Sequence, residues 1–289
     1  MKKILVTGAS GQVGSELKVL APRYSQFEWV FADRSVLNLS NLKAISQVLD
    51  EIKPHIIINC AAYTAVDKAE TETELADILN HQAVAVLAQW SHSNSCQFLH
   101  LSTDYVFDGN SNTALSEEAL TGPINIYGQT KLAGELACLR ENPMAIIIRT
   151  SWVYSSFGAN FVKTMSRLMQ ERNSLNVVND QIGSPTYAAD LAEAIVTIII
   201  HPNRQAGMYH YSNEGEFSWY EFANAIQEIG GFDCQITGIP SADYPTPARR
   251  PKYSLLDKSK IVTTFGVAVP EYRESLEKCM GLIRFNSRN

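Results

Sequence analysis

The sequence of 289 residues predicts an α/β protein with a Rossmann-like, doubly wound parallel sheet and a smaller C-terminal α+β lobe. Three observations lead to this fold class. A short aliphatic run at residues 3–7 leads directly into a glycine-rich turn. Short strands of the buried type then alternate with helical segments as far as Arg149. After Thr150 the segments become irregular, and residues 240–251 are rich in proline.

The first strand, Lys3–Thr7, is followed by Gly8, Gly11 and Gly14 and then by a helix that ends near Leu20. Glycines at this spacing allow a tight turn, and they let a pyrophosphate approach the backbone N–H groups at the start of the helix. The position between first strand and first helix favours dinucleotide binding over a simple turn. The residues expected to contact the dinucleotide here are Gly8, Gly11, Gln12, Val13 and Gly14.

The second strand, Glu28–Ala32, ends at Asp33 and Arg34. An acidic residue about 20 positions after the glycines is typical of proteins that bind the ribose hydroxyls of NAD. An arginine beside it suits the 2′-phosphate of NADP instead. Because both residues are present, the sequence leaves the choice between NADH and NADPH open.

The third strand, His55–Asn59, follows a helix over residues 41–52 and leads into small residues. Small side chains at the carboxyl end of a parallel strand let a cofactor lie against the backbone. We therefore expect Ala61, Ala62 and Tyr63 to contact the cofactor, although close packing alone would also explain the two alanines. A single long helix is expected over residues 72–92.

The next strand, Gln97–Leu101, delivers Thr103 to the same edge of the sheet, and a loop over residues 106–126 precedes a helix with Tyr127 and Lys131. Residues four apart share one helix face, roughly 6 Å apart along the axis. An ammonium group beside a phenol should lower the pKa of Tyr127 and make it a usable proton donor. A Thr103 hydroxyl at the same carbonyl oxygen would polarise the carbonyl for hydride attack.

The remaining segments predict an interleaved arrangement. A strand over 144–149, a helix over 187–200 and a strand over 207–211 are expected on the parallel sheet. We therefore assign residues 1–150 and about 185–213 to an NAD(P)-binding domain, and about 151–184 and 214–289 to a substrate lobe. Ser218 and Glu221 form a capping box that should begin a helix in that lobe.

Composition excludes several classes of function. The net charge is 24 − 30 = −6, and no basic tract is present, so nucleic acid is not an expected partner. The longest aliphatic stretch, Ala194–Ile200, is far shorter than the ~20 residues that span a bilayer, so no membrane segment is expected. Five scattered cysteines indicate reduced thiols and a cytoplasmic protein.

Taken together, these motifs resemble the extended short-chain dehydrogenase/reductases that act on nucleotide sugars, and within them the dTDP-4-dehydrorhamnose reductase family. The segments that carry the resemblance span most of the chain: Asn59–Glu70, Ser102–Phe107, Tyr127–Glu135, Arg149–Tyr154 and Asp180–Thr186. The resemblance implies reduction of the C4 keto group of dTDP-4-dehydro-L-rhamnose by NADPH or NADH. The product, dTDP-L-rhamnose, is a sugar donor for bacterial surface polysaccharides.

The resemblance also implies roles for individual residues. Tyr127 would donate the proton, Lys131 would bind the nicotinamide ribose and tune Tyr127, and Thr103 would bind the carbonyl oxygen. Asp104 and Tyr105 would contact the sugar. This chemistry requires no protein nucleophile and no metal ion.

Three more residues are substrate candidates by the same resemblance. Trp152 would pack on the apolar face of the sugar, with a place in the core as the alternative reading. Asn160 and Arg250 are candidates for binding the diphosphate, against ordinary surface roles. The family further implies a homodimer, in some members bridged by Mg²⁺.

Related activities differ at identifiable positions. Nucleotide-sugar dehydratases carry Thr-Asp-Glu where this chain has Thr103, Asp104 and Tyr105, so elimination of water is disfavoured. Residues 102–108 contain no cysteine for ring epimerisation of the kind that produces GDP-fucose. The alternative outside catalysis is a cofactor-binding regulatory subunit similar to the beta subunit of methionine adenosyltransferase. The sequence does not distinguish dTDP from another nucleotide carrier.

Overall fold

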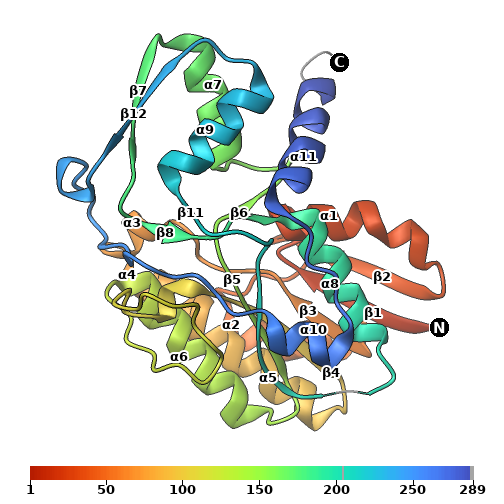
Figure 1. The fold of residues 1–289 in the computed structure, drawn as a ribbon. Coiled ribbons are helices and arrows are strands. Elements are labelled where there is room, and N and C mark those ends of the chain that lie inside the picture. The colour runs from red at the N-terminus through yellow and green to blue at the C-terminus, as the bar shows by residue number, and fades with distance from the viewer. Residues whose placement is uncertain (204, 287–289) are drawn as a thin grey trace.

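The computed structural model describes residues 1–203 and 205–286 and has a six-stranded parallel sheet at its centre (Figure 1). The strand order is β10-β5-β4-β3-β1-β2, and every neighbouring pair is parallel. The strands are β1 (Lys2–Thr7), β2 (Phe27–Ala32), β3 (Ile56–Asn59), β4 (Gln97–Thr103), β5 (Ile146–Thr150) and β10 (Gly207–Tyr211). The predicted fold class is confirmed.

Helices cover both faces of this sheet. One face is covered by α2 (Leu42–Ile52), α5 (Ala83–Ser93) and α6 (Ile126–Glu141), and the other by α1 (Gln12–Leu20), α8 (Ala188–Ile200) and α10 (Ser259–Phe265) (Figure 1). The strands are apolar on both sides because both sides are buried. In β1, Leu5 packs on the face covered by α2, α5 and α6, while Ile4 and Val6 pack on the face covered by α1, α8 and α10.

The order of the strands reverses at β1. From β1 the chain goes first to β2 on one side and then crosses to β3 on the other. In an open parallel sheet, ligands bind in the crevice outside the carboxyl ends of the strands at such a switch point. The residues that follow β1 and β3 therefore face each other at this position.

The long helix expected over residues 72–92 is confirmed and is continuous over residues 73–93, but it contains a π-helical turn that the sequence did not predict. It consists of α4 (Thr73–Asp77), a π-helical turn η2 (Ile78–Gln82) and α5. Asn80 is fully buried in the π-turn, where its side chain accepts a 2.8 Å hydrogen bond from the Tyr63 N–H and donates one of 3.1 Å to the Tyr63 carbonyl. The widened turn thus ties the helix to the segment that follows β3.

A second core lies beyond the carboxyl edge of the sheet. It is formed by α7 (Phe161–Glu171), α9 (Trp219–Gly230) and α11 (Tyr272–Asn286), with the parallel pair β7 (Ser174–Val178) and β12 (Gln235–Ile239) beside them. The predicted capping box is present at the start of α9. The sequence did not predict β12. The predicted domain boundaries at about 150, 185 and 213 stay predictions.

Short elements connect the two cores. They are α3 (Val66–Ala69) and the strand pairs β6 (Val153–Tyr154) with β9 (Thr186–Tyr187) and β8 (Ile182–Gly183) with β11 (Phe217–Ser218). Three 3₁₀ turns complete the chain: η1 (Ala21–Tyr24), η3 (Asp104–Val106) and η4 (Ser241–Asp243). In the part of the chain that the structure describes, no helix is long and apolar enough to cross a membrane.

Candidate active site

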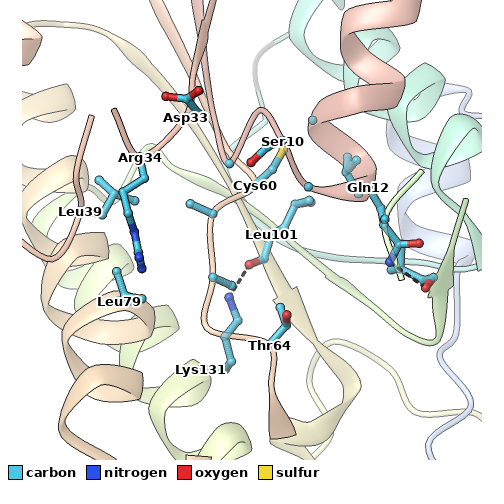
Figure 2. Close-up of a pocket in the computed structure, with 18 of the residues that line it drawn as sticks. Ser10, Gln12, Asp33, Arg34, Leu39, Cys60, Thr64, Leu79, Leu101 and Lys131 are labelled. Atoms are coloured by element: carbon cyan, nitrogen blue, oxygen red, sulfur yellow. Dashed lines mark hydrogen bonds between the residues drawn. The ribbon is translucent and has the colours of Figure 1, made fainter. Parts of the chain in front are cut away.

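A pocket of about 500 Å³ lies at the carboxyl edge of the sheet, over the switch point (Figure 2). It brings together residues that the sequence predicts to bind the cofactor. These residues are up to 123 positions apart, from Gly8 to Lys131. The predicted residues that line it are Gly8, Gly11, Gln12, Val13, Gly14, Asp33, Arg34, Ala61, Ala62, Tyr127 and Lys131. Tyr63 is not part of the lining, because its hydroxyl is directed to Glu72 at 2.9 Å.

The glycines at the start of α1 form a cradle that side chains would fill. Gly8 has a φ of +65°, and a Cβ there would lie 2.7 Å from the Ala61 nitrogen. A Cβ at Gly14 would overlap the Gly8 carbonyl oxygen. No side chain caps the helix at Gly11, so its first N–H groups remain available to an anion. These features fit the pyrophosphate of a dinucleotide.

Asp33 and Arg34 differ in what they contact. The Asp33 carboxylate accepts hydrogen bonds from the Ser35 N–H at 2.8 Å and the Ser35 hydroxyl at 2.6 Å, which lower the pKa of Asp33. Arg34 makes no hydrogen bond or ion pair to any residue that the structure describes. Figure 2 shows its guanidinium extending along the pocket toward Leu79, away from the Asp33 carboxylate.

Tyr127 is held in the first turn of α6 by contacts from three directions. Asn125 caps the helix by accepting a 2.7 Å hydrogen bond from the Gly128 N–H, and Glu70 accepts one of 2.9 Å from the Ile126 N–H. Gly128 has no Cβ, and a Cβ at this position would overlap the Tyr105 carbonyl oxygen. The helix therefore approaches closely enough for the Tyr105 and Tyr127 rings to meet edge to face, with centroids 5.5 Å apart.

The predicted lowering of the Tyr127 pKa is wrong for this structure. Burial raises the pKa of Tyr127 to about 12, and Lys131 does not contribute to the shift. Lys131 Nζ donates a 2.6 Å hydrogen bond to the Leu101 carbonyl (Figure 2). Burial also lowers the pKa of Lys131 to about 8. Sequence spacing placed both residues on one helix face but did not include burial.

Thr103 lies beside Tyr127 and is bound to its own neighbours. Its hydroxyl donates a 3.0 Å hydrogen bond to Asp104 and accepts one of 3.2 Å from the Tyr105 N–H. A hydrogen bond with Thr103 acts to lower the pKa of Tyr127, against the effect of burial. Asp104 is 2% exposed, and burial raises its pKa to about 6.

Trp152 and Asn160 contact protein groups in this structure. Trp152 stacks on Trp219, with ring centroids 3.6 Å apart and planes 13° apart, and its φ of +47° is unusual for a tryptophan. Asn160 caps α7 by accepting a hydrogen bond from the Lys163 N–H, and its amide donates a 2.9 Å hydrogen bond to Gln12. The polar atoms of Asn160 are thus already engaged between the two cores.

Arg250 lies in the loop before α10 and forms a two-pronged ion pair with Asp67 of α3. Its two terminal nitrogens lie 3.1 and 2.8 Å from the Asp67 carboxylate oxygens. Tyr105 and Tyr244 are close enough to contribute to the raised pKa of Arg250. The ion pair joins the C-terminal loop to α3. Tyr105 links this pair to Thr103 and Tyr127, because its ring contacts the Tyr127 ring and its N–H donates to Thr103.

Sequence reasoning missed thirteen lining residues. They are Ser10, Leu37, Asn38, Leu39, Cys60, Thr64, Leu79, Leu101, Ser102, Thr150, Val153, Gly158 and Ala159. Several of these residues are next in sequence to residues already predicted at the ends of strands. Their place in the sequence could therefore have identified them as lining residues. Leu79, Gly158 and Ala159 reach the pocket only through the tertiary fold and have no such signal.

Nearly the whole chain matches one protein family. Residues 1–284 match the family model described as RmlD substrate binding domain. The chain belongs to this RmlD family. A relative from Sinorhizobium fredii named dTDP-4-dehydrorhamnose reductase is 41% identical over 285 residues, which cover 96% of each chain.

Solved structures of the RmlD type are similar in fold over nearly their full length. A dTDP-4-dehydrorhamnose reductase from Clostridium acetobutylicum has a TM-score of 0.94 and 38% identity, covering 98% of this chain and 99% of that one. One from Bacillus anthracis, solved in complex with NADP, has a TM-score of 0.92 and 39% identity, covering 97% and 99%. The family resemblance inferred from the sequence is confirmed.

Proposed function

We propose that the protein reduces the C4 keto group of dTDP-4-dehydro-L-rhamnose to give dTDP-L-rhamnose. The observation that carries this proposal is the position of Tyr127 and Thr103 beside a pocket with a dinucleotide cradle. The names of the RmlD relatives support the same substrate. The product serves as a sugar donor for bacterial surface polysaccharide.

The residues of the chain account for the proton in this reaction. A bound reduced nicotinamide supplies the hydride. The Tyr127 phenol, with its pKa raised to about 12, remains protonated at neutral pH and donates its proton to the keto oxygen. Thr103 orients the same oxygen, and Lys131, one helical turn away, offsets the charge left on Tyr127.

We further propose that NADPH is preferred over NADH. The hydrogen bonds from Ser35 both end on Oδ1 of Asp33, which leaves Oδ2 as an acceptor, so the Asp33 carboxylate does not decide the preference. Arg34 lines the pocket without an ionic partner among the described residues and suits a 2′-phosphate. The sequence alone left this choice open.

A turnover assay tests the proposed reaction. Purified protein is mixed with the 4-keto sugar nucleotide and NADPH, and the loss of nicotinamide absorbance and the formation of dTDP-L-rhamnose are measured. We expect one NADPH consumed for each product formed. A protein that binds NADPH tightly but never consumes it would support the regulatory-subunit alternative instead.

The expectations of a homodimer, of Mg²⁺ at its interface and of a cytoplasmic location stay predictions. Within residues 1–203 and 205–286 there is no group of three or more His, Cys, Asp or Glu side chains that could hold a metal ion by itself. Sedimentation of the protein with and without Mg²⁺ tests the homodimer and the role of Mg²⁺.

A further inference from the structure

A buried row of polar side chains lies beneath the pocket and ends at Lys131. Thr7, Asn59 and His100 are register partners on the adjacent strands β1, β3 and β4. The Thr7 hydroxyl donates a 2.5 Å hydrogen bond to Asn59 Oδ1, and Asn59 Nδ2 lies 2.9 Å from His100 Nδ1. His100 Nε2 lies 3.4 Å from Lys131 Nζ. All four residues are at most 2% exposed.

The row has a direction, which follows from the donors and acceptors in it. Thr7 Oγ1 accepts from the Ala61 N–H and gives its own proton to Asn59. The Asn59 amide nitrogen has only protons to offer, so His100 Nδ1 must accept. Burial, and after it the positive charge of Lys131, lower the pKa of His100 well below its ordinary value, so the ring is neutral. Its single proton therefore lies on Nε2, the atom that faces Lys131.

This arrangement bears on the charge of Lys131. A lysine ammonium has three donors and no acceptor, so it cannot accept from an Nε2–H group. A lysine amine can accept from His100 while it donates to the Leu101 carbonyl at 2.6 Å. We propose that His100 is a positioning residue that donates its Nε2–H to Lys131 and thereby favours the neutral amine of Lys131 in the free protein.

The other groups around Lys131 leave this role to His100. The ionisable groups that face it are Glu135, Cys60, Cys138 and the nearby Tyr127. Burial raises the pKa of both thiols and of Tyr127 to about 12, so these three are neutral near pH 7. Glu135 favours the ammonium of Lys131, but Arg149 binds both Glu135 oxygens at 2.9 and 2.7 Å.

The consequence for the reaction rests on the proposed function. The ammonium of Lys131 is the form that offsets a negative charge on Tyr127. Because the His100 donor favours the amine of Lys131, it sets the upper pH limit above which the free enzyme loses the active ammonium form. This limit should appear in kcat/KM, which reports the ionisation of the free enzyme. Protonation of Lys131 from solvent would accompany entry into the active form.

Nuclear magnetic resonance of cofactor-free protein with ¹⁵N-labelled histidine tests the tautomer directly. We expect the His100 signals to show a protonated Nε2 and an unprotonated Nδ1 at neutral pH. A protonated Nδ1 would overturn the proposal, because Nε2 would then accept from a Lys131 ammonium. This measurement involves no turnover, so it can fail or succeed independently of the proposed reaction.

The variant Asn59→Asp should reverse the direction of the hydrogen bond between residue 59 and His100. A carboxylate offers only acceptors, so it selects the Nδ1–H tautomer of His100, and its negative charge also favours the Lys131 ammonium. We expect the proton of His100 to move to Nδ1 and the alkaline limb of the kcat/KM profile to move up by about one pH unit. The matched control Thr7→Ser keeps the hydroxyl and should leave the tautomer on Nε2. An Asn59→Asp protein with an unmoved alkaline limb and an Nε2 proton would contradict the proposal, and if this variant does not fold, the wild-type spectrum decides.

Discussion

Ser254 donates a 2.6 Å hydrogen bond to Oδ2 of Asp104, although the two residues are 150 positions apart. Asp104 Oδ1 accepts from Thr103, so the carboxylate lies between the C-terminal loop and the residue that is expected to bind the keto oxygen. Both hydrogen bonds favour the ionised carboxylate, yet burial outweighs them and raises the pKa of Asp104 to about 6. The loop before α10 therefore influences the site through a titrating group.

Asp104 should make the stability of the protein depend on pH. Its folded pKa lies above the ordinary value of 3.8, so its contribution is fully present below about pH 3.8 and is lost as the pH rises through about 6. We expect the unfolding free energy of Asp104→Asn, relative to wild type, to increase by roughly 2 to 3 kcal/mol between pH 4 and pH 7. Urea unfolding at several pH values measures this. In Ser254→Ala the loss of stability with rising pH should occur at a higher pH than in wild type. An unchanged pH midpoint for this loss would contradict the assigned contact.

Removal of the Tyr127 hydroxyl should separate chemistry from binding. In Tyr127→Phe the proton donor is lost while the ring remains, so we expect kcat to fall by about 100-fold or more. The dissociation constant for NADPH, measured by titration, should change little. Tyr24→Phe, in η1 away from the pocket, is the control and should keep the wild-type rate. A Tyr127→Phe enzyme with nearly normal kcat would show that another group donates the proton.

Arg34 should determine the cofactor preference. A charge-assisted hydrogen bond contributes about 1.5–3 kcal/mol, so Arg34→Ala should raise KM for NADPH by roughly 10- to 100-fold. KM for NADH should remain close to the wild-type value, because NADH has no 2′-phosphate. Steady-state kinetics with both cofactors measures this. Arg172→Ala, at the end of α7, is the matched control for loss of one positive charge. Equal losses for the two cofactors would argue against phosphate recognition.

Arg250 and its partner distinguish diphosphate binding from a structural ion pair. If Arg250 binds the diphosphate, Arg250→Ala should raise KM for the nucleotide sugar without changing the affinity for NADPH. Asp67→Ala removes the competing carboxylate and should leave that KM unchanged or lower it. Asp67→Ala should lose no more than about 1 kcal/mol of stability, because the Asp67 side chain is 40% exposed, whereas Arg250→Ala should lose more, because it also removes hydrogen bonds to Thr246 and Ala248. An equal rise of KM in both variants would indicate that only the ion pair matters.

Gly134 should be required for the packing of α6 on the π-turn. A Cβ at this position would overlap the Asn80 carbonyl oxygen, which is backbone and cannot rotate away. We expect Gly134→Ala to lower the unfolding free energy by about 1–3 kcal/mol. The control is Gly281→Ala in α11, where no atom lies within 4 Å of the added Cβ and helix propensity favours alanine by about 1 kcal/mol. Chemical denaturation of both variants tests the difference.

Local patterns were sufficient to predict much of the sheet and the pocket. The aliphatic run of β1, the glycines after it and the spacing of Tyr127 and Lys131 each lie within a few residues, and their positions follow from strand and helix periodicity. The family resemblance added the expected substrate and reaction. These parts required no knowledge of which distant segments meet.

Other features depend on contacts between distant segments and had no local signal. The strand β12 pairs with β7 across about 60 residues, and Trp219 at the start of α9 stacks on Trp152, which lies between β5 and β6. The pKa of Tyr127 was predicted in the wrong direction because spacing reveals its neighbour but not its burial. The row from Thr7 to His100 exists only because of the register between three strands.

The place of β10 at the edge of the sheet has a consequence for biosynthesis. Ribosomes deliver β1 to β5 first, but β10 follows only after the segment with α7 and α8 has been made. Until residue 211 has left the exit tunnel, the outer edge of β5 has no neighbouring strand and offers free backbone groups to other nascent chains. Between the synthesis of β5 and that of β10, the unfinished sheet therefore has an open edge of the kind that can pair with other chains.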